Sequence, residues 1–212
     1  MIVMNLATII VTRSKSCHVK TLHGVLRLNI KCLQKGLNNQ IVYVNDDPFE
    51  KADVIQKCMK THDRIVFIDF GIGVDNESID QCFEKHEGVG CLVFPGVVEG
   101  VDWDMFKKKI QKKSTEPVSQ MGLNFDTDVD RKISKNIYTV TNTSARSFVI
   151  FTKNLMKNAK DKKGNVNLHV KMFEKLREQK VKIHAFTASK LIMTYPHECI
   201  SNILSAAGVK TN

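Results

Sequence analysis

Asp69 is the residue of this 212-residue chain whose position first suggests chemistry. It follows the apolar run RIVFI (64–68) and precedes two glycines, Gly71 and Gly73. A charge at the end of a buried strand costs free energy unless a partner compensates it. Mg²⁺ or Mn²⁺ would be such a partner, because hard ions prefer carboxylates and bridge diphosphate oxygens. The alternative is a loop cap, or an ion pair with Arg64 or a lysine.

Polar side chains also follow other apolar runs in the first half of the chain. They are Thr12 and Arg13 after the first run and Asn45, Asp46 and Asp47 after the second, whereas the fourth run ends in Pro95 and Gly96. Ligands of open α/β sheets bind beyond the carboxyl ends of the strands. The sequence therefore predicts a ligand site at that edge of a sheet.

The elements that must position these residues follow from apolar periodicity. Short β-branched runs predict strands at 6–12, 40–44, 64–68, 90–96 and 181–188, and a strand or strand-to-helix junction at 148–152. Apolar residues at three- and four-residue steps, together with capping residues, predict helices at 19–35, 49–60, 76–86, 101–112, 166–180 and 196–208. Residues 113–135 are polar and irregular, which predicts a long loop. This order predicts an α/β fold with a Rossmann-like, mixed, mostly parallel central sheet and helices on both faces.

Composition narrows the class of protein. The net charge is +10, and no apolar run approaches the ~18 residues that a membrane span needs. The six cysteines form no CxxC pair, which favours reduced thiols in a cytoplasmic protein. The lysine clusters at 106–113 and 157–164 have few aromatic neighbours, so nucleic acid is an unlikely partner. The positive charge indicates either a solvated surface or attraction to a phosphorylated ligand.

Sequence motifs that bind phosphate through glycine loops are absent. There is no GxxxxGK[ST], no GxGxxG after the first strand and no GxSxG. A nucleotide site in this chain would therefore consist of side chains and a metal ion.

Two long stretches resemble the opening of GT-A glycosyltransferases, especially the family-2-like group. They are LATIIVTRSKSCHVKT with its continuation to ADVIQ, and RIVFIDFGIGVDNESIDQCFE, within residues 5–100. In that group the second strand ends in an acidic pair and a later strand ends in D-x-D. FPGVVEGVDWDMF and EPVSQMGLNFDTDVD are similar to segments of glycosyltransferase domains of large DNA viruses such as the chlorella viruses.

The resemblance implies one glycosyltransferase domain over 1–212, with a nucleotide-binding half (1–100) and an acceptor or catalytic half (101–212). It implies a UDP-sugar donor, a glycan or glycoprotein acceptor and an Mn²⁺ (or Mg²⁺) cofactor. The residues implied for nucleotide binding are Thr12, Arg13, Asn45, Asp46, Asp47, Phe70 and Gly71. Asp69 would be a metal ligand, although the second acidic place of D-x-D is Gly71 here. His184 is a second candidate ligand, with His197 as a weaker rival; a structural role is the alternative for both.

Sugar transfer also needs a carboxylate to take the proton of the acceptor hydroxyl or to stabilise the sugar cation. The candidates are Glu99, Asp102, Asp104 and Asp126. Asp102 is more simply a helix N-cap. Trp103 is a candidate for stacking on a sugar or for the core.

Two other functions remain open from sequence. One is a non-catalytic nucleotide- or RNA-binding module, whose binding would depend steeply on salt. The other is a nucleotidyltransferase, which would release pyrophosphate from a nucleoside triphosphate.

Overall fold

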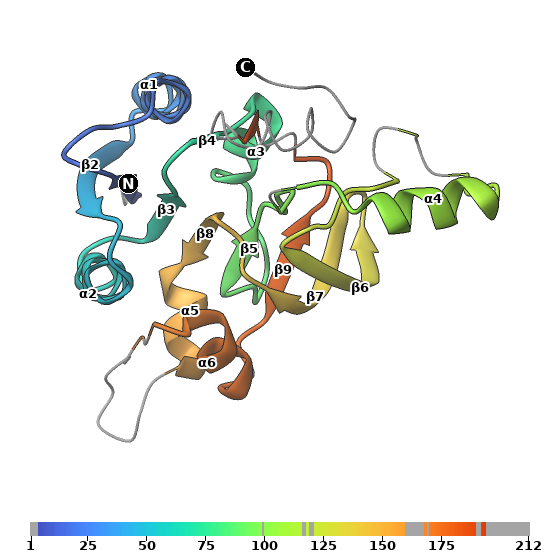
Figure 1. Ribbon diagram of the computed structural model, residues 1–212. Helices are drawn as coiled ribbons and strands as arrows, with labels where there is room; N and C mark the ends of the chain where they lie inside the picture. The colour runs from blue at the N-terminus through green and yellow to red at the C-terminus, as the bar shows by residue number, and fades with distance from the viewer. Residues whose placement is uncertain are drawn as a thin grey trace, which may run out of the picture.

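The computed structural model describes residues 4–98, 100–115, 118, 121–159, 168, 170–189 and, for the backbone alone, 192–193. These residues form a mixed eight-stranded sheet in the order β2-β1-β3-β8-β5-β9-β7-β6 (Figure 1). Its strands are β1 (Asn5–Thr12), β2 (Asn38–Asn45), β3 (Arg64–Ile68), β5 (Cys91–Val93), β6 (Thr127–Ser134), β7 (Ile137–Thr143), β8 (Ser147–Phe151) and β9 (Ile183–Phe186). A separate pair joins β4 (Ile72–Gly73) to β10 (Ile192–Met193).

Strand direction makes the sheet mixed. β1, β2 and β3 are parallel neighbours, as are β5 and β9. β8 runs antiparallel between β3 and β5, and β7 runs antiparallel between β9 and β6. The prediction of a mixed sheet is confirmed, and six of its eight strands share one direction, although only three of its seven neighbouring pairs are parallel. Because β8 is reversed, its amino end lies beside the carboxyl end of β3.

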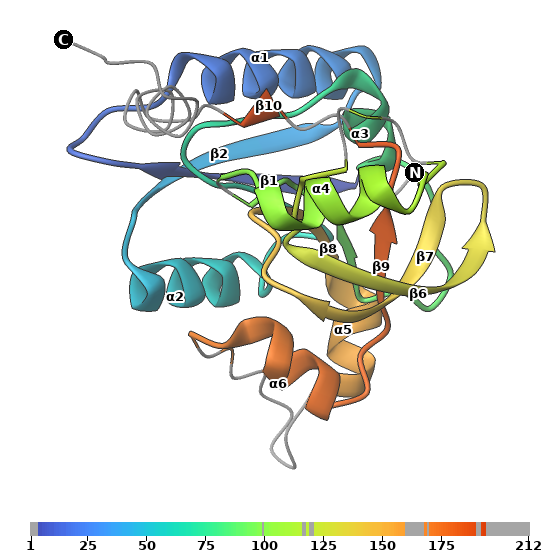
Figure 2. The same ribbon diagram turned by 45° about the vertical axis from the view of Figure 1, so that its right-hand side comes forward.

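Helices cover both faces of the sheet, as the sequence predicts. The helices α1 (Val19–Gln34) and α3 (Asn76–Gln81) pack on one face, and α2 (Pro48–Cys58), α5 (Thr152–Ala159) and α6 (Met172–Glu178) pack on the other (Figures 1 and 2). α4 (Trp103–Gln111) buries none of its residues fully. None of the helices in the described ranges is long and apolar enough to cross a membrane.

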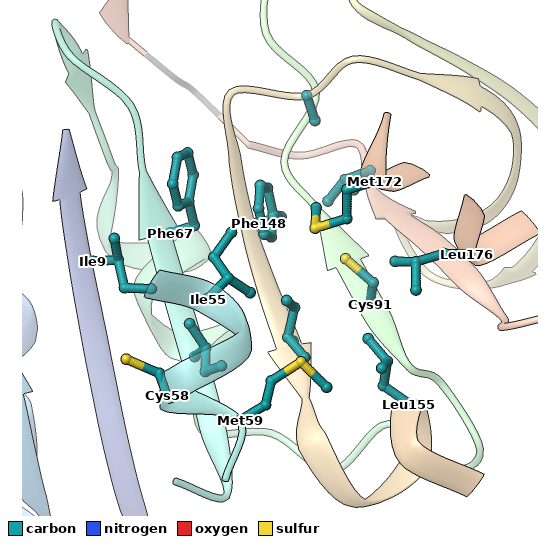
Figure 3. Packing of buried hydrophobic residues seen from close by; sticks show 14 of the residues in the cluster. Ile9, Ile55, Cys58, Met59, Phe67, Cys91, Phe148, Leu155, Met172 and Leu176 are labelled. Carbon is teal, nitrogen blue, oxygen red and sulfur yellow. The ribbon is translucent and has the colours of Figure 1, made fainter. Parts of the chain in front are cut away.

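The apolar runs of the sequence contribute side chains to two hydrophobic cores, one on each face of the sheet. In β1, Ile9 and Val11 belong to the core under α2, whereas Leu6 and Ile10 belong to the core under α1. Successive side chains of a strand point to opposite faces, so a strand covered on both sides has no polar alternation. Figure 3 shows the first of these cores. In it the Phe67 ring of β3 stacks on the Phe148 ring of β8, with the ring centroids 4.8 Å apart.

Capping residues fix where the helices of the site begin. Asp47 accepts the backbone N–H of Glu50 at 2.8 Å, and Pro48 occupies the first turn of α2. Asp102 accepts the N–H of Met105 at 2.8 Å and caps α4. The predicted cap at Asp102 is confirmed, and both caps use a carboxylate that was also a candidate for ligand chemistry.

The prediction of a loop over 113–135 is wrong for its last part, because 127–134 form β6, paired with β7. β6 is exposed along its length except at Thr127, so it carries no apolar alternation that would indicate a strand. The strands at 90–96 and 181–188 are shorter than predicted, and so is the helix at 166–180. The predicted helix at 196–208 lies outside the described residues.

Candidate functional site

Asp69 meets two cations and a backbone N–H at the end of β3. Its Oδ2 lies 2.9 Å from Nε of Arg146, and its Oδ1 lies 3.5 Å from Nζ of Lys51. Oδ1 also accepts the N–H of Phe70 at 2.9 Å. The Asp69 side chain is only 14% exposed, so these contacts replace most of its hydration.

A second carboxylate continues the same network. Asp46, at the end of β2, accepts a hydrogen bond from Nε of Arg13 at 2.6 Å and another from Nζ of Lys51. The hydrogen bond from Lys51 is the main reason that the pKa of Asp46 is lowered, with Arg13 adding to it and burial opposing it. Lys51 thus joins the two carboxylates. We call Arg13, Asp46, Lys51, Asp69 and Arg146 the charged cluster.

Two aromatic rings border the charged cluster. The guanidinium carbon of Arg13 lies 5.0 Å from the centroid of the Phe70 ring. The ring of His18 meets the same ring edge-on at 5.7 Å. A guanidinium over an aromatic face is stabilised by the ring's quadrupole. Phe70 therefore helps to fix Arg13 beside the end of β1.

Strand register explains why these residues meet. Thr12 of β1 pairs with Asn45 of β2, so Arg13 and Asp46 come next to each other. Ile68 of β3 pairs with Ser147 of β8, so Asp69 and Arg146 also come next to each other. The backbone N–H of Asp69 donates to the Arg146 carbonyl at 2.9 Å. The structure thus gathers polar strand-end residues at one edge of the sheet.

The backbone after Asp69 explains the departure from D-x-D. Gly71 has a φ of +79°, and the Ile72 N–H reaches the Asp69 carbonyl at 3.3 Å. A turn with positive φ at its third residue is the type II geometry, which favours glycine. A carboxylate-bearing residue at position 71 would be strained there, so the turn itself selects against the second acidic ligand.

Of the catalytic candidates that the structure describes, Asp126 is the one that neighbours the charged cluster. Its Oδ1 accepts the N–H of Gly96, just past β5, at 3.0 Å and the hydroxyl of Thr127 at 2.8 Å. Burial raises the pKa of Asp126. Hydrogen bonds from Gly96, Thr127 and the Arg146 backbone, and the Arg146 charge, act in the opposite direction. Arg146 therefore pairs with Asp69 through its side chain and acts on Asp126 through its backbone N–H and its charge.

Among the described residues, no side-chain hydrogen bond or ion pair joins the other carboxylate candidates to the charged cluster. Asp47 and Asp102 cap helices, and Asp104 is exposed in the first turn of α4. Asn45 donates to the Glu50 carboxylate at 2.9 Å. Glu99 and His197 lie outside the described residues.

The side chains of Thr12 and Trp103 also have local contacts. The Thr12 hydroxyl donates to the Val44 carbonyl at 3.1 Å, which holds it against β2. Trp103 is 45% exposed and meets Phe106 edge-on at 5.8 Å. The prediction that this exposed ring stacks on a sugar stays a prediction.

His184 does not share a site with Asp69. In the sheet register His184 stands in the row of Leu92, Val149 and Val66. Asp69 comes three residues after Val66 and three strands away, which is about 10 Å along the strands and about 14 Å across them. One ion cannot bind both side chains across that separation.

The described residues at this edge of the sheet do not fit a divalent ion held by protein side chains. Within the part of the chain that the structure describes, no three His, Cys, Asp or Glu side chains are grouped so that they could hold a metal. Both oxygens of Asp69 already face donors, and two of these donors are cations that would repel a metal ion.

Sequence reasoning missed two members of the charged cluster, Lys51 and Arg146. Lys51 lies one turn into α2, where it reaches back to the strand end that precedes the helix. Arg146 comes directly before β8. Its position in the sequence indicates a role at this site only weakly, because the reversal of β8 that brings Arg146 to the carboxyl edge depends on long-range pairing.

Comparison with known proteins gives a likeness of structure. No protein-family model and no curated protein matches the chain. One similar solved structure is a mutant β-1,4-galactosyltransferase 7 of Drosophila in complex with manganese, UDP-Gal and xylobiose. It is 12% identical, the match covers 92% of this chain and 73% of that one, and the TM-score is 0.48. Another is GalNAc-T7 with UDP, GalNAc and Mn²⁺, at 12% identity and a TM-score of 0.49, covering 91% of this chain and 44% of that one.

Proposed function

We propose that this protein is a glycosyltransferase that moves a sugar from a UDP-sugar to a hydroxyl group of a glycan or glycoprotein. The observation that carries the proposal is the position of Arg146, whose side chain pairs with Asp69 in the charged cluster and whose backbone N–H and charge act on Asp126. The sequence resemblance to GT-A glycosyltransferases, with its virus-encoded members, supports the choice of donor and acceptor. The nucleotide class rests on that resemblance alone.

Sugar transfer needs two things from the protein, and this edge of the sheet has residues suited to both. The leaving diphosphate needs positive charge, which Arg13, Lys51 and Arg146 carry. The acceptor hydroxyl needs a proton acceptor, for which Asp126 is our candidate because burial raises its pKa toward the working range of a general base.

The reaction balances without a further reactant. The acceptor oxygen forms a bond to the anomeric carbon, and the bond from that carbon to the diphosphate oxygen breaks. The bonding electrons leave with the diphosphate, and the proton of the hydroxyl passes to Asp126. No step is assigned to a metal ion, because the described residues at this edge do not fit one.

The first test is binding. A thermal-shift panel with UDP, GDP, CMP and ADP should show stabilisation by UDP alone. A ligand at a hundred times its dissociation constant stabilises a fold by about 2.7 kcal/mol. The absence of a shift with UDP, or equal shifts with all four nucleotides, would contradict the assignment.

The second test is turnover. UDP release from a panel of UDP-sugars should be measured for the wild type and for Asp126→Asn. Asp128→Asn is the matched control, because Asp128 is exposed two residues further along β6. We expect loss of UDP release for Asp126→Asn only. Release of pyrophosphate from UTP and a sugar phosphate would indicate a nucleotidyltransferase instead.

A further inference from the structure

We infer that the cations of the charged cluster hold the diphosphate of the donor in place of a divalent metal ion. This inference rests on the proposed function and adds that donor binding is independent of metal. In it, Asp69 and Asp46 are positioning residues. They orient Arg146, Lys51 and Arg13 and do not bind an ion themselves.

The first step is the state of Asp69. A metal ligand needs an oxygen lone pair directed at an open position, and it needs companions that share the ion. Here Oδ2 pairs with Arg146, Oδ1 receives Phe70 N–H and faces Lys51, and the turn at Gly71 excludes a neighbouring carboxylate. A divalent ion at Asp69 would also stand beside two positive side chains. These contacts of Asp69 are those of a carboxylate that holds cationic side chains in position.

The second step is the supply of donors. An arginine has five N–H donors and a lysine has three. Arg146 uses Nε for Asp69 and Nη2 for the Phe70 carbonyl at 2.8 Å, and Arg13 uses Nε for Asp46. Among the described residues, these contacts therefore engage fewer than the five donors of each guanidinium group. Phosphate oxygens suit them, because the guanidinium fork matches phosphate geometry in two parallel hydrogen bonds.

The third step is the charge. The three cations of the charged cluster exceed its two carboxylates by one (3 − 2 = +1). Within the cluster a UDP-sugar diphosphate would thus meet one excess positive charge, which Asp126 beside Arg146 offsets when it is ionised. The cations are also held before the ligand arrives. Arg146 is fixed at two points, Lys51 lies between two carboxylates and Arg13 stacks on Phe70. Such preorganisation lowers the entropy lost on binding.

The test is UDP binding to the full chain by titration calorimetry, once with excess EDTA and once with Mn²⁺. We expect the dissociation constant to agree within about twofold between the two conditions. Inorganic pyrophosphate should compete with UDP in EDTA. These measurements need only the wild-type protein, so they do not depend on whether a variant folds.

Variants then identify the groups. We expect Lys51→Met and Arg146→Met to weaken UDP binding in EDTA by about tenfold to a hundredfold, which corresponds to the loss of charged hydrogen bonds. Lys57→Met is the matched control, because Lys57 lies on the same helix and pairs only at the surface with Asp53. Arg146→Lys should recover part of the loss, since it restores the charge without the fork.

The outcomes separate the two proposals. If UDP binds only when Mn²⁺ is present, the inference is overturned and the sugar-transfer proposal stands. If Lys51→Met and Arg146→Met bind UDP as tightly as Lys57→Met does, the inference is also overturned. If UDP binds in neither condition, the proposed function fails, and the inference fails with it.

Discussion

Asp69 and Arg146 are 77 residues apart in the sequence, yet their side chains form an ion pair of 2.9 Å where β3 ends and β8 begins. The pair ties the amino-terminal half of the sheet, which carries Arg13 and Asp46, to the segment that follows Asp126 and β7. It also answers the question raised by a charge at the end of a buried strand. Basic side chains and a backbone N–H compensate this carboxylate.

Replacing Asp69 by alanine should therefore destabilise the protein. The change removes a mostly buried carboxylate that pairs with Arg146 and Lys51. Hydrogen bonds to charged groups contribute about 1.5–3 kcal/mol each. We expect the free energy of unfolding, measured by urea denaturation, to fall by roughly 2 kcal/mol.

Asp53→Ala is the control for this loss. Asp53 pairs with Lys57 on the exposed side of α2, where solvent screens the pair, so its removal should leave the unfolding free energy nearly unchanged. Equal effects of the two substitutions would show that Asp69 is no more than a surface charge.

The turn at Gly71 gives a second prediction. A side chain at a φ of +79° costs about 1–2 kcal/mol, least for asparagine and most for a β-branched residue. We expect losses of unfolding free energy in the order Asn < Asp < Val at this position. Gly71→Asp restores the D-x-D pattern, and we expect it to lower the melting temperature without creating Mn²⁺ binding by calorimetry. Tight Mn²⁺ binding by Gly71→Asp would contradict our account of the turn.

The sequence allowed the strand-end side of this site to be predicted. The continuous apolar runs of β1 and β3 indicate strands buried on both faces, and the polar residues that follow them had to emerge at one edge. Asp47 and Asp102 were predictable as caps because their chemistry is local.

Long-range pairing limited the rest of the prediction. β6 has only Thr127 buried, and its turn into β7 depends on Asn136 with a φ of +62°, so nothing periodic marked the hairpin. The reversal of β8 between β3 and β5 is a property of the whole sheet. Arg146 could therefore not be assigned to the site from its own neighbours in sequence.

Asp126→Asn gives a third prediction, in which stability and activity respond differently. The pKa of Asp126 is raised, so between the pKa values of the unfolded and folded states the folded protein binds more protons. The stability that comes from this group is present at low pH and is lost as pH rises through its folded-state pKa. At pH 7 the ionised carboxylate is therefore a cost, which the amide avoids while it still accepts from Gly96.

We expect the melting temperature of Asp126→Asn at pH 7 to equal or exceed that of the wild type. The rate of UDP release should fall by about 10²–10⁴-fold, as is typical for loss of a general base. A variant that is less stable at pH 7 but keeps its activity would count against both the burial argument and the proposed role. Asp128→Asn should change neither quantity.

The lowered pKa of Asp46 gives a fourth prediction, this one of pH-dependent stability. The hydrogen bond from Lys51 and the contact with Arg13 favour its ionised form, so the unfolded state binds more protons near the pKa of Asp46. The stabilisation is complete above the unfolded-state value of about 3.9 and is lost as pH falls through the lower folded-state pKa.

The wild type should exceed Asp46→Asn in unfolding free energy by at most about 1 kcal/mol near neutral pH, because the pairs are partly exposed. That difference should shrink below about pH 4 and in 1 M salt. Asp130→Asn, at an exposed position of β6, should show no such pH dependence. A difference between the wild type and Asp46→Asn that persists unchanged at about pH 2.5 would mean that Asp46 stabilises the fold by something other than its charge.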